Sequence, residues 1–461
     1  MAGMGAVAYV LMRKDFPITY MELTPDGGVA RISTQISNRE MAPLEGMYRP
    51  DWLARWWGER SIPMEQDNVK RLLDSKGYPN PGSYLTSNLG LSLTDYYWLR
   101  PVGSGLSWKD VNLFDNDFKD DLLDWRRDVT DDGEPTRSTP RYTPNGSLQG
   151  TIEKTWVINN GERCLVKGNH SYLSAESINE VIASEIHRRQ GFAEYADYHL
   201  VRIAGKDYEY GCYSKLFTSQ ERELVSAWAL YSNEKRRGNV STMEHLLNMC
   251  TKYGMDKEEI RAGLEYQMLV DFVMSGHDRH LTNISFLRDA DTLRFTGLSP
   301  IYDSGGSMFA GKEIPRNMKG LLSVETGGIV GKESNVVKLV RDKGLIDLAK
   351  LPPASYVCEM YSKDPKMSEK DINNIAHWYE VKIDLCRDLQ LGRDVFSKTY
   401  VACGRGPVRE PGIQGVSNGY QERWNEFARG IRADLETLSS LESRLAGDML
   451  NTQLASGRKS V

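Results

Sequence analysis

One short polar segment, residues 276–284, contains residue types that phosphoryl transfer requires. That reaction needs a carboxylate near the attacking hydroxyl, oxygen ligands for Mg²⁺ and a cation on the phosphates, with little covalent help from the protein. Asp278 precedes Asn283 by five residues, the separation between the base and the metal-binding Asn of protein kinase catalytic loops. Asp303 follows twenty residues later, after an apolar run and before a Ser-Gly pair. The order predicts Asp278 as the base and Asn283 and Asp303 as Mg²⁺ ligands.

A lysine upstream supplies the cation that such a site needs. Lys167 ends the apolar run Leu165-Val166, and a helix is expected to begin about seven residues later. A carboxylate on that helix should hold the lysine, as in kinases, and both Glu180 and Glu185 are available. On a helical wheel Glu185 shares a face with the apolar residues of the helix, while Glu180 lies roughly opposite. The residues alone leave this choice open.

A loop with two glycines comes before these elements and is predicted to cover the phosphates. It runs from Asn145 to Thr151 and contains Ser147 between Gly146 and Gly150. Successive backbone N–H groups in such loops bind anions. Loop, Lys, helical Glu, Asp with Asn, and a final Asp then follow one another in the order found in kinases.

The elements expected around these residues form a β-rich part followed by a helical part. Alternating apolar residues and turn residues predict strands at 8–12, 18–23, 29–32, 151–158, 164–167, 198–203 and 208–217, and a hairpin within 284–301. Helical periodicity predicts helices within 50–76, after a Ser174 cap up to Gly191, and over most of the chain beyond Glu221. This order predicts an α+β, two-lobed protein-kinase-like fold with an additional mixed α/β N-terminal region.

Composition excludes several other classes of protein. The 461 residues include 58 Lys and Arg and 63 Asp and Glu, and the resulting net charge of −5 does not favour direct nucleic-acid binding. No apolar run reaches the roughly 18 to 20 residues that a membrane helix needs. The apolar start at 2–12 is expected to be a first strand, because its charges follow it. The six cysteines are far apart and form no CxxC pair, which favours reduced thiols in a cytoplasmic protein.

Six stretches resemble the HipA-like family of bacterial serine/threonine kinases, whose members act as toxins in toxin–antitoxin pairs. The resemblance runs from about residue 146 to the early 300s. The stretches are Ser147-Leu-Gln-Gly-Thr-Ile-Glu-Lys154-Thr, Leu165-Val-Lys167, Ile178-Asn-Glu180 with Gly191-Phe192, Ser214-Lys215-Leu216-Phe217, Asp278-Arg-His280-Leu-Thr-Asn283 and Pro300-Ile-Tyr-Asp303.

The resemblance implies an ATP-binding site and its parts. It makes Glu180, not Glu185, the partner of Lys167. It assigns Lys215 and Phe217 to the hinge that meets adenine. Gly150 belongs to the loop that covers the nucleotide.

The resemblance also implies an ATP- and Mg²⁺-dependent kinase that acts on a protein. Asp278 and His280 are then catalytic-loop residues. Ser147 matches the position at which family members autophosphorylate, and a phosphate there adds about two negative charges where ATP phosphates bind. An antitoxin or repressor is the implied partner, and neither a membrane nor direct nucleic-acid contact is expected.

Arg279 distinguishes this chain from the family's usual catalytic loop, which has a small residue between Asp and His. The form Asp-Arg-His-x-x-Asn is typical of phosphoinositide kinases, so a lipid or small-molecule kinase is one alternative function. The acidic net charge and the lack of a basic amphipathic surface argue against an anionic membrane substrate. The other alternative is a non-catalytic nucleotide-binding regulatory protein.

Four regions are predicted along the chain. Residues 1–140 form the N-terminal mixed region and end in an acidic connector that starts near Asp110. Residues 141–220 form the N-lobe and residues 221–402 the C-lobe. Residues 403–461 are a Gly- and Pro-rich linker followed by an amphipathic helix.

Overall fold

The computed structural model describes residues 5–44, 49–118, 141–329 and 331–397. Most of the acidic connector, residues 119–140, lies outside the described residues, as do the predicted C-terminal linker and helix. Nearly all described residues belong to one compact unit, Met1–Pro315 with Lys319–Gly404.

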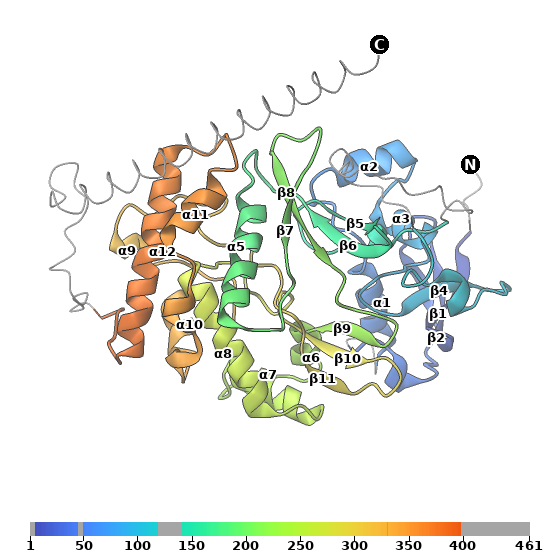
Figure 1. Ribbon diagram of the computed structural model, residues 1–461. Helices are drawn as coiled ribbons and strands as arrows, with labels where there is room; N and C mark the ends of the chain where they lie inside the picture. Colours follow the sequence, from blue (N-terminus) through green and yellow to red (C-terminus); the bar gives the residue numbers. More distant parts are fainter. Residues whose placement is uncertain (1–4, 45–48, 119–140, 330, 398–461) are drawn as a thin grey trace, which may run out of the picture. The chain divides into compact units, whose positions relative to one another are not determined.

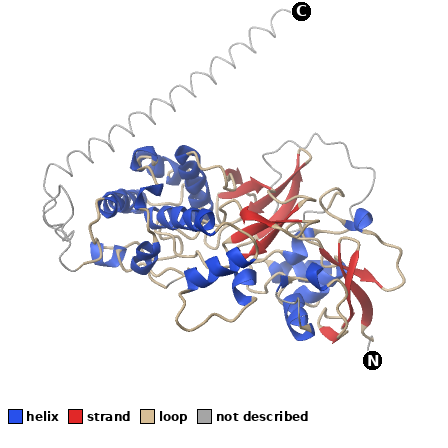
Figure 2. Cartoon of the chain, turned by 90° about the horizontal axis from the view of Figure 1, so that it is seen from below, coloured by secondary structure: helices blue, strands red, loops and turns tan. Residues whose placement is uncertain are grey.

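Three antiparallel sheets carry the strands of the described part (Figure 1; Figure 2). The first has the order β3-β2-β1-β4 and consists of β1 (Val7–Arg13), β2 (Phe16–Leu23), β3 (Val29–Ile32) and β4 (Tyr97–Pro101). The second has the order β5-β6-β8-β7 and consists of β5 (Lys154–Asn159), β6 (Glu162–Lys167), β7 (His199–Arg202) and β8 (Tyr210–Lys215). The third has the order β11-β10-β9 and consists of β9 (Arg222–Ser226), β10 (Ser285–Asp289) and β11 (Phe295–Leu298).

The helices are concentrated after the second sheet. The α-helices are α1 (Pro50–Gly58), α2 (Val69–Lys76), α3 (Pro81–Ser87), α4 (Trp108–Val111), α5 (Ala175–Gln190), α6 (Ala227–Ser232), α7 (Thr242–Lys252), α8 (Lys257–Val273), α9 (Met318–Leu321), α10 (Glu333–Leu339), α11 (Ala354–Tyr361) and α12 (Glu369–Gln390). Helix α5 packs against β8 on one side and α11 on another, as Figure 1 shows.

The N-terminal strands confirm the first three sequence predictions, and β4 adds a strand that the sequence did not indicate. β4 pairs with β1 antiparallel although the two strands are far apart in the sequence: Met12 lies opposite Trp98 and Leu11 opposite Leu99. The predicted helical region 50–76 contains two helices, α1 and α2, because the chain between them is irregular.

The hairpin of β5 and β6 follows the sequence prediction closely. Asn159 pairs with Glu162, so the turn holds only Asn160 and Gly161, whose φ angles are 50° and 78°. Two positive φ angles define the turn type that matches strand twist, and Asn-Gly is the favoured pair for it. The same register sets Lys154 directly opposite Lys167.

Helix α5 begins and ends where the sequence predicts, but its N-terminus is capped differently. Gly191 ends it with a φ of 72°, a conformation that glycine adopts at little cost. The Ser174 hydroxyl makes no cap bond and accepts the Tyr210 N–H at 3.0 Å instead. The Asn169 side chain accepts the Ser177 N–H at 2.9 Å, so a residue from the preceding loop satisfies the helix end.

The third sheet contains one predicted hairpin and one unpredicted strand. β10 and β11 confirm the hairpin within 284–301. β9 pairs with the other edge of β10, in a stretch expected to be helical. Its Glu223 is buried and accepts hydrogen bonds from Arg13 at 2.6 Å and Arg288 at 2.7 Å. The two arginines, from distant segments, thus offset the cost of burying the Glu223 carboxylate.

The N-terminal region shares a hydrophobic core with residues that follow residue 140. Met12 and Trp98 belong to one cluster of buried side chains that also contains Leu148, Trp156 and Ala290. Burial of such apolar surface is the main force that holds the segments together.

Two further predictions concern cysteines and membranes. The five cysteines in the described part are buried free thiols. Among the described residues, no helix combines the length and apolar character needed to cross a bilayer.

Candidate active site

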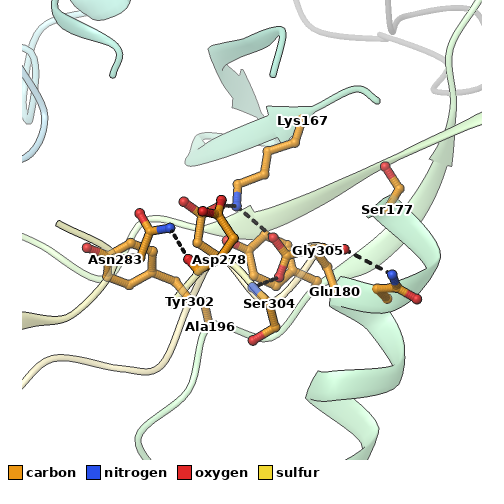
Figure 3. A network of polar contacts seen from close by, with 12 residues as sticks. Lys167, Ser177, Glu180, Ala196, Asp278, Asn283, Tyr302, Ser304 and Gly305 are labelled. Carbon is orange, nitrogen blue, oxygen red and sulfur yellow. Dashed lines mark hydrogen bonds and ion pairs between the residues drawn. The ribbon is translucent and has the colours of Figure 1, made fainter. Parts of the chain in front are cut away.

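Lys167 forms the centre of a buried polar network. It is the last residue of β6, and its Nζ lies 2.8 Å from Glu180 Oε1 on α5 and 2.5 Å from Asp303 Oδ1 (Figure 3). The ammonium also lies 4.8 Å from the centre of the Tyr198 ring. One strand, one helix and one loop therefore bring their charges to the same point.

Opposite charges determine the protonation of this network. Burial alone would lower the pKa of Lys167, but the Asp303 and Glu180 carboxylates more than offset it and hold that pKa well above its usual value. Burial would raise the pKa of Asp303, yet the cations of Lys167 and Lys154 hold it below its ordinary range. Both groups are therefore charged at neutral pH.

Glu180 is the carboxylate that pairs with Lys167, and helical periodicity alone did not distinguish it from Glu185. Its second oxygen accepts the Ser304 N–H at 2.9 Å, which ties α5 to the segment after Asp303. Glu185 is instead held by Arg188 and Arg189 at 2.5 Å each. Helix α5 is buried on more than one side, so a single apolar face did not identify its inward carboxylate.

Asp278 and Asn283 lie beside this network at the two ends of the catalytic-type loop (Figure 3). The Asn283 side chain donates to the Asp278 carbonyl at 2.8 Å. His280 Nε2 lies 3.5 Å from Asp278 Oδ1. The Asp278 side chain is 57% exposed; partial desolvation raises the pKa of its carboxyl, His280 opposes this, and Asp303 adds to it. A raised pKa makes the Asp278 carboxylate a stronger base than an Asp carboxylate of ordinary pKa.

Gly306 forms the wall behind Asp278. A Cβ at Gly306 would lie 2.8 Å from the Asp278 Cβ, closer than van der Waals packing allows. The Gly306 carbonyl accepts the His277 N–H at 2.9 Å. The absence of a side chain at this position lets the loop carrying Asp278 approach the segment after Asp303.

Arg279 points into the protein and joins the two loops of the site. Its guanidinium pairs with Asp271, with Nε 3.1 Å from Oδ2, and donates to the carbonyls of Tyr302 at 2.5 Å and Asn283 at 3.2 Å. Only 8% of the residue is exposed. Arg279 is therefore a buried structural connection between the loop at Asp278 and the segment at Tyr302.

Lys154 is a second cation of the site that the sequence analysis did not single out. It is buried, and its Nζ lies close beneath Gly150, because a Cβ there would be 2.8 Å from it. Burial lowers the pKa of Lys154, Asp303 opposes this, and Lys167 adds to it. Within the described residues its ammonium forms no hydrogen bond or ion pair. The signal was available, since the Asn-Gly turn sets Lys154 opposite Lys167.

The loop predicted to cover phosphates is held by the N-terminal region. Gln66 donates to the Gly150 carbonyl at 3.0 Å, and the Asp67 N–H donates to the Thr151 carbonyl at 3.2 Å. The Ser147 hydroxyl lies within hydrogen-bond distance of the Leu91 and Pro144 carbonyls, at 3.0 and 2.9 Å. The loop is therefore fixed in one conformation by residues from outside the predicted lobes.

The two residues assigned to the hinge occupy different environments. Phe217 stacks on Tyr302, with ring centres 5.9 Å apart, directly before Asp303 in the chain. Lys215 ends β8, is exposed, and pairs with Glu162 at 2.7 Å. The structure brings Phe217 to the site and directs Lys215 to a surface ion pair.

Oxygen ligands for a metal ion are limited to a few residues. Among the described residues, no three His, Cys, Asp or Glu side chains gather as a metal cluster. Asn283 offers an amide oxygen and Asp303 a carboxylate; Asn283 is bonded to the Asp278 carbonyl, and Asp303 acts on the Asp278 carboxyl through its charge. Such a sparse set suits Mg²⁺, which is commonly held by one or two side chains together with phosphate oxygens and water.

A cavity of about 1380 Å³ lies elsewhere in the described part of the chain. It is lined by residues between Val337 and Phe396, and none of the site residues contributes to it. The volume of a cavity alone does not identify the candidate site in this protein, because the converging charged side chains lie around Lys167.

Comparisons with known proteins identify one matching family model and several similar solved structures. Residues 146–334 match the family model described as HipA-like C-terminal domain. None of the curated proteins matches the chain. Among solved structures, the Helicobacter pylori proinflammatory kinase CtkA is 16% identical with a TM-score of 0.39, over 52% of this chain and 95% of that chain. HipA of the Shewanella oneidensis MR-1 toxin–antitoxin system, solved with HipB and operator DNA, is 14% identical with a TM-score of 0.46, over 84% and 98%.

The family match covers every residue of the network described above. Lys167 and Glu180, then Asp278 and Asp303, fall within the matched range in the predicted order. The α+β, kinase-like fold predicted from the sequence is thereby confirmed. Over residues 146–334 the chain is thus similar to the HipA-like C-terminal domain.

Proposed function

We propose that the chain is an ATP- and Mg²⁺-dependent kinase that phosphorylates serine or threonine of a protein. The observation that supports this most is the contact of Lys167 Nζ with Glu180 and Asp303 beside Asp278 and Asn283. Phosphoryl transfer depends mainly on positioning and on electrostatic stabilisation, and these charged side chains converge on one point.

Two lysines bind the nucleotide phosphates in this proposal. An ammonium has three N–H donors, and Lys167 uses two of them on Glu180 and Asp303. The third donor binds an oxygen of the α- or β-phosphate. Lys154 contributes a second positive charge from the opposite position on β5. Gly150 and its neighbours cover the phosphates from above.

Asp278 orients the substrate hydroxyl and accepts its proton. Its raised pKa increases its basicity, and His280 holds the carboxylate from the side. Asn283 and Asp303 hold Mg²⁺, which neutralises charge on the β- and γ-phosphate oxygens when bound. Asn283 also anchors the backbone of Asp278, so the base and the metal ligand keep a constant separation.

A protein substrate is favoured over a lipid because Arg279 is buried and fully engaged. The feature shared with phosphoinositide kinases thus lies away from the substrate. The match of residues 146–334 to the HipA-like C-terminal domain supports a toxin role and an antitoxin-type repressor as partner.

Inhibitory self-phosphorylation at Ser147 is part of the proposal. The Ser147 hydroxyl is tied to the Leu91 and Pro144 carbonyls, so the loop must leave its position before the hydroxyl can reach a phosphate. A phosphoserine adds about two negative charges and cannot return to a site lined by carbonyl oxygens. The loop would then remain away from Lys154.

Incubation of the purified chain with ATP and Mg²⁺, followed by intact-mass and phosphopeptide analysis, tests the proposed function. We expect a mass gain on Ser or Thr, with Ser147 among the modified residues, and no gain in Asp278→Asn. Glu180→Gln should lose transfer by roughly a hundredfold, since Lys167 loses its anchor, while the matched Glu185→Gln should keep it. A wild-type chain that starts unphosphorylated, binds ATP and yet transfers no phosphate contradicts the proposal.

A further inference from the structure

We infer that an exposed surface next to the catalytic loop binds an acidic segment of the protein substrate. This aromatic–basic surface consists of Trp228 and Tyr231 on α6 and of Lys235, Arg236 and Arg237 in the turn that follows. The inference rests on the proposed function, because it assigns the substrate class of that same site.

The surface is attached directly to the catalytic loop. The Trp228 N–H donates to the Leu281 carbonyl at 3.0 Å, and the Ala227 N–H donates to the Ile284 carbonyl at 2.7 Å. Leu281 lies between Asp278 and Asn283 in the sequence. Trp228 is 46% exposed, so a large apolar residue that is hydrogen-bonded to the loop of Asp278 faces solvent.

Contacts continue without a break from the indole to the basic turn. Tyr231 stacks on Trp228, with ring centres 5.9 Å apart and planes at 22°. His245 supports Tyr231 from below in an edge-on contact at 4.9 Å. Arg236 Nε donates to the Tyr231 hydroxyl at 3.1 Å, and its NH1 donates to the Val240 carbonyl. The arginine is thereby held beside the aromatic pair.

The charge of the surface is positive. Lys235, Arg236 and Arg237 are exposed, and within the described residues none of them forms an ion pair. The neighbouring Glu234 is already paired with Lys252. Three uncompensated cations in a row are notable in a chain of net charge −5, and they attract carboxylates in a partner.

An acidic polypeptide is the partner that this combination fits. A substrate that brings a hydroxyl to Asp278 must lie across the surface around the catalytic loop. Aromatic rings contact apolar side chains and peptide groups, and Trp is prominent among residues that dominate binding. Lys and Arg bind carboxylates, and exposed pairs of this kind weaken with salt. We expect acidic residues to flank the phosphorylated serine or threonine.

Fluorescence anisotropy with a fluorescein-labelled peptide tests this inference without relying on catalysis. The peptide is rich in Glu and Asp with one central Ser, and the full chain is titrated into it. Trp228→Ala should weaken binding about fivefold, and the triple change Lys235→Glu, Arg236→Glu, Arg237→Glu by at least about tenfold. Added salt should weaken wild-type binding.

Matched controls separate this surface from general effects. Trp52 is another exposed tryptophan, 39% accessible, and Trp52→Ala should leave peptide binding unchanged. Changing the exposed Lys350, Lys363 and Lys370 to Glu alters net charge equally and should have little effect. ATP binding and circular dichroism should match wild type in all variants, since none of these side chains lies in the proposed nucleotide site.

Each outcome decides the matter. The inference is overturned if the wild type does not bind the acidic peptide, or if the Trp228 and triple variants bind it as well as the wild type does. Tighter binding of a Lys-rich peptide or of a single-stranded oligonucleotide also overturns it. If the wild type transfers no phosphate but binds the peptide with the expected losses, the surface stands and the kinase proposal fails. If it phosphorylates proteins but Trp228→Ala neither binds the acidic peptide more weakly nor phosphorylates it more slowly, the kinase proposal stands alone.

Discussion

At the scale of single residues, the opposed lysines of β5 and β6 are informative. Lys154 and Lys167 face each other across an antiparallel pair, where like charges destabilise a sheet. Lys167 is compensated by two carboxylates, whereas Lys154 is buried beneath the Gly150 loop. Retaining a second cation there costs stability, and an anionic ligand such as a nucleotide phosphate offsets that cost.

The His280–Asp278 pair gives a prediction on pH. Partial desolvation raises the pKa of the Asp278 carboxyl, and His280 lowers it. Removing the imidazole in His280→Ala should raise that pKa further, so the acid limb of the activity profile should move to higher pH. The pH dependence of single-turnover phosphoryl transfer measures this. The control His199→Ala removes an exposed histidine paired with Asp197 and should leave the acid limb of the activity profile unchanged. A shift of the acid limb to lower pH in His280→Ala would contradict the effect assigned to His280.

At the scale of elements, the segment after Asp303 positions the catalytic loop. Asp303 has a φ of 60°, which is uncommon for a residue with a side chain and turns the chain sharply after Tyr302. The Ser304 N–H then bonds Glu180, and Asn179 donates to the Gly305 carbonyl at 2.9 Å (Figure 3). Helix α5 thus holds this segment through two consecutive residues.

Gly306→Ala should reduce activity by displacing Asp278. The added methyl would come within 2.8 Å of the Asp278 Cβ, and a shift of the base by about 1 Å costs on the order of a hundredfold in rate. We expect kcat to fall while ATP affinity changes little, as measured by steady-state kinetics and calorimetry. Gly105→Ala, where a Cβ meets nothing within 4 Å, is the control. An unchanged kcat in Gly306→Ala would show that the position of Asp278 does not depend on the missing side chain at Gly306.

At the scale of the whole molecule, the N-terminal region and the later segments are joined by buried charge. Glu223 on β9 accepts from Arg13 on β1 and Arg288 on β10, and all three side chains are almost fully buried. Gln66 and Asp67 meanwhile hold the loop at Gly150. The N-terminal region therefore contributes both to stability and to the conformation of the site.

Glu223→Gln should destabilise the folded protein strongly. The change keeps the side-chain size but leaves two buried guanidinium groups without their carboxylate, at a cost of roughly 3 to 5 kcal/mol. Urea unfolding measures the difference. Glu22→Gln removes a half-buried carboxylate that pairs with the exposed Arg31 at 3.8 Å, and should cost less than about 1 kcal/mol. Equal stability of the two variants would mean that the buried network does not connect the segments.

Much of the site was determined by the sequence itself, because its signals are local. The Asn160-Gly161 turn sets the register of a hairpin, Gly191 ends a helix, and the spacing of Asp278 from Asn283 lies within one loop. These features depend on residues a few positions apart, and local backbone geometry is enough to produce them. The order of the motifs along the chain then indicated the kinase-like fold.

Only the tertiary structure decided what depends on distant packing. Glu180 faces Lys167 because α5 is buried on several sides, which a helical wheel does not reveal. Arg279 points inward because its guanidinium pairs with Asp271 and donates to the Tyr302 carbonyl. Glu223 is buried because Arg13, 210 residues earlier, reaches it. Burial and pairing of charges are properties of segments brought together by the core, so no local pattern contains them.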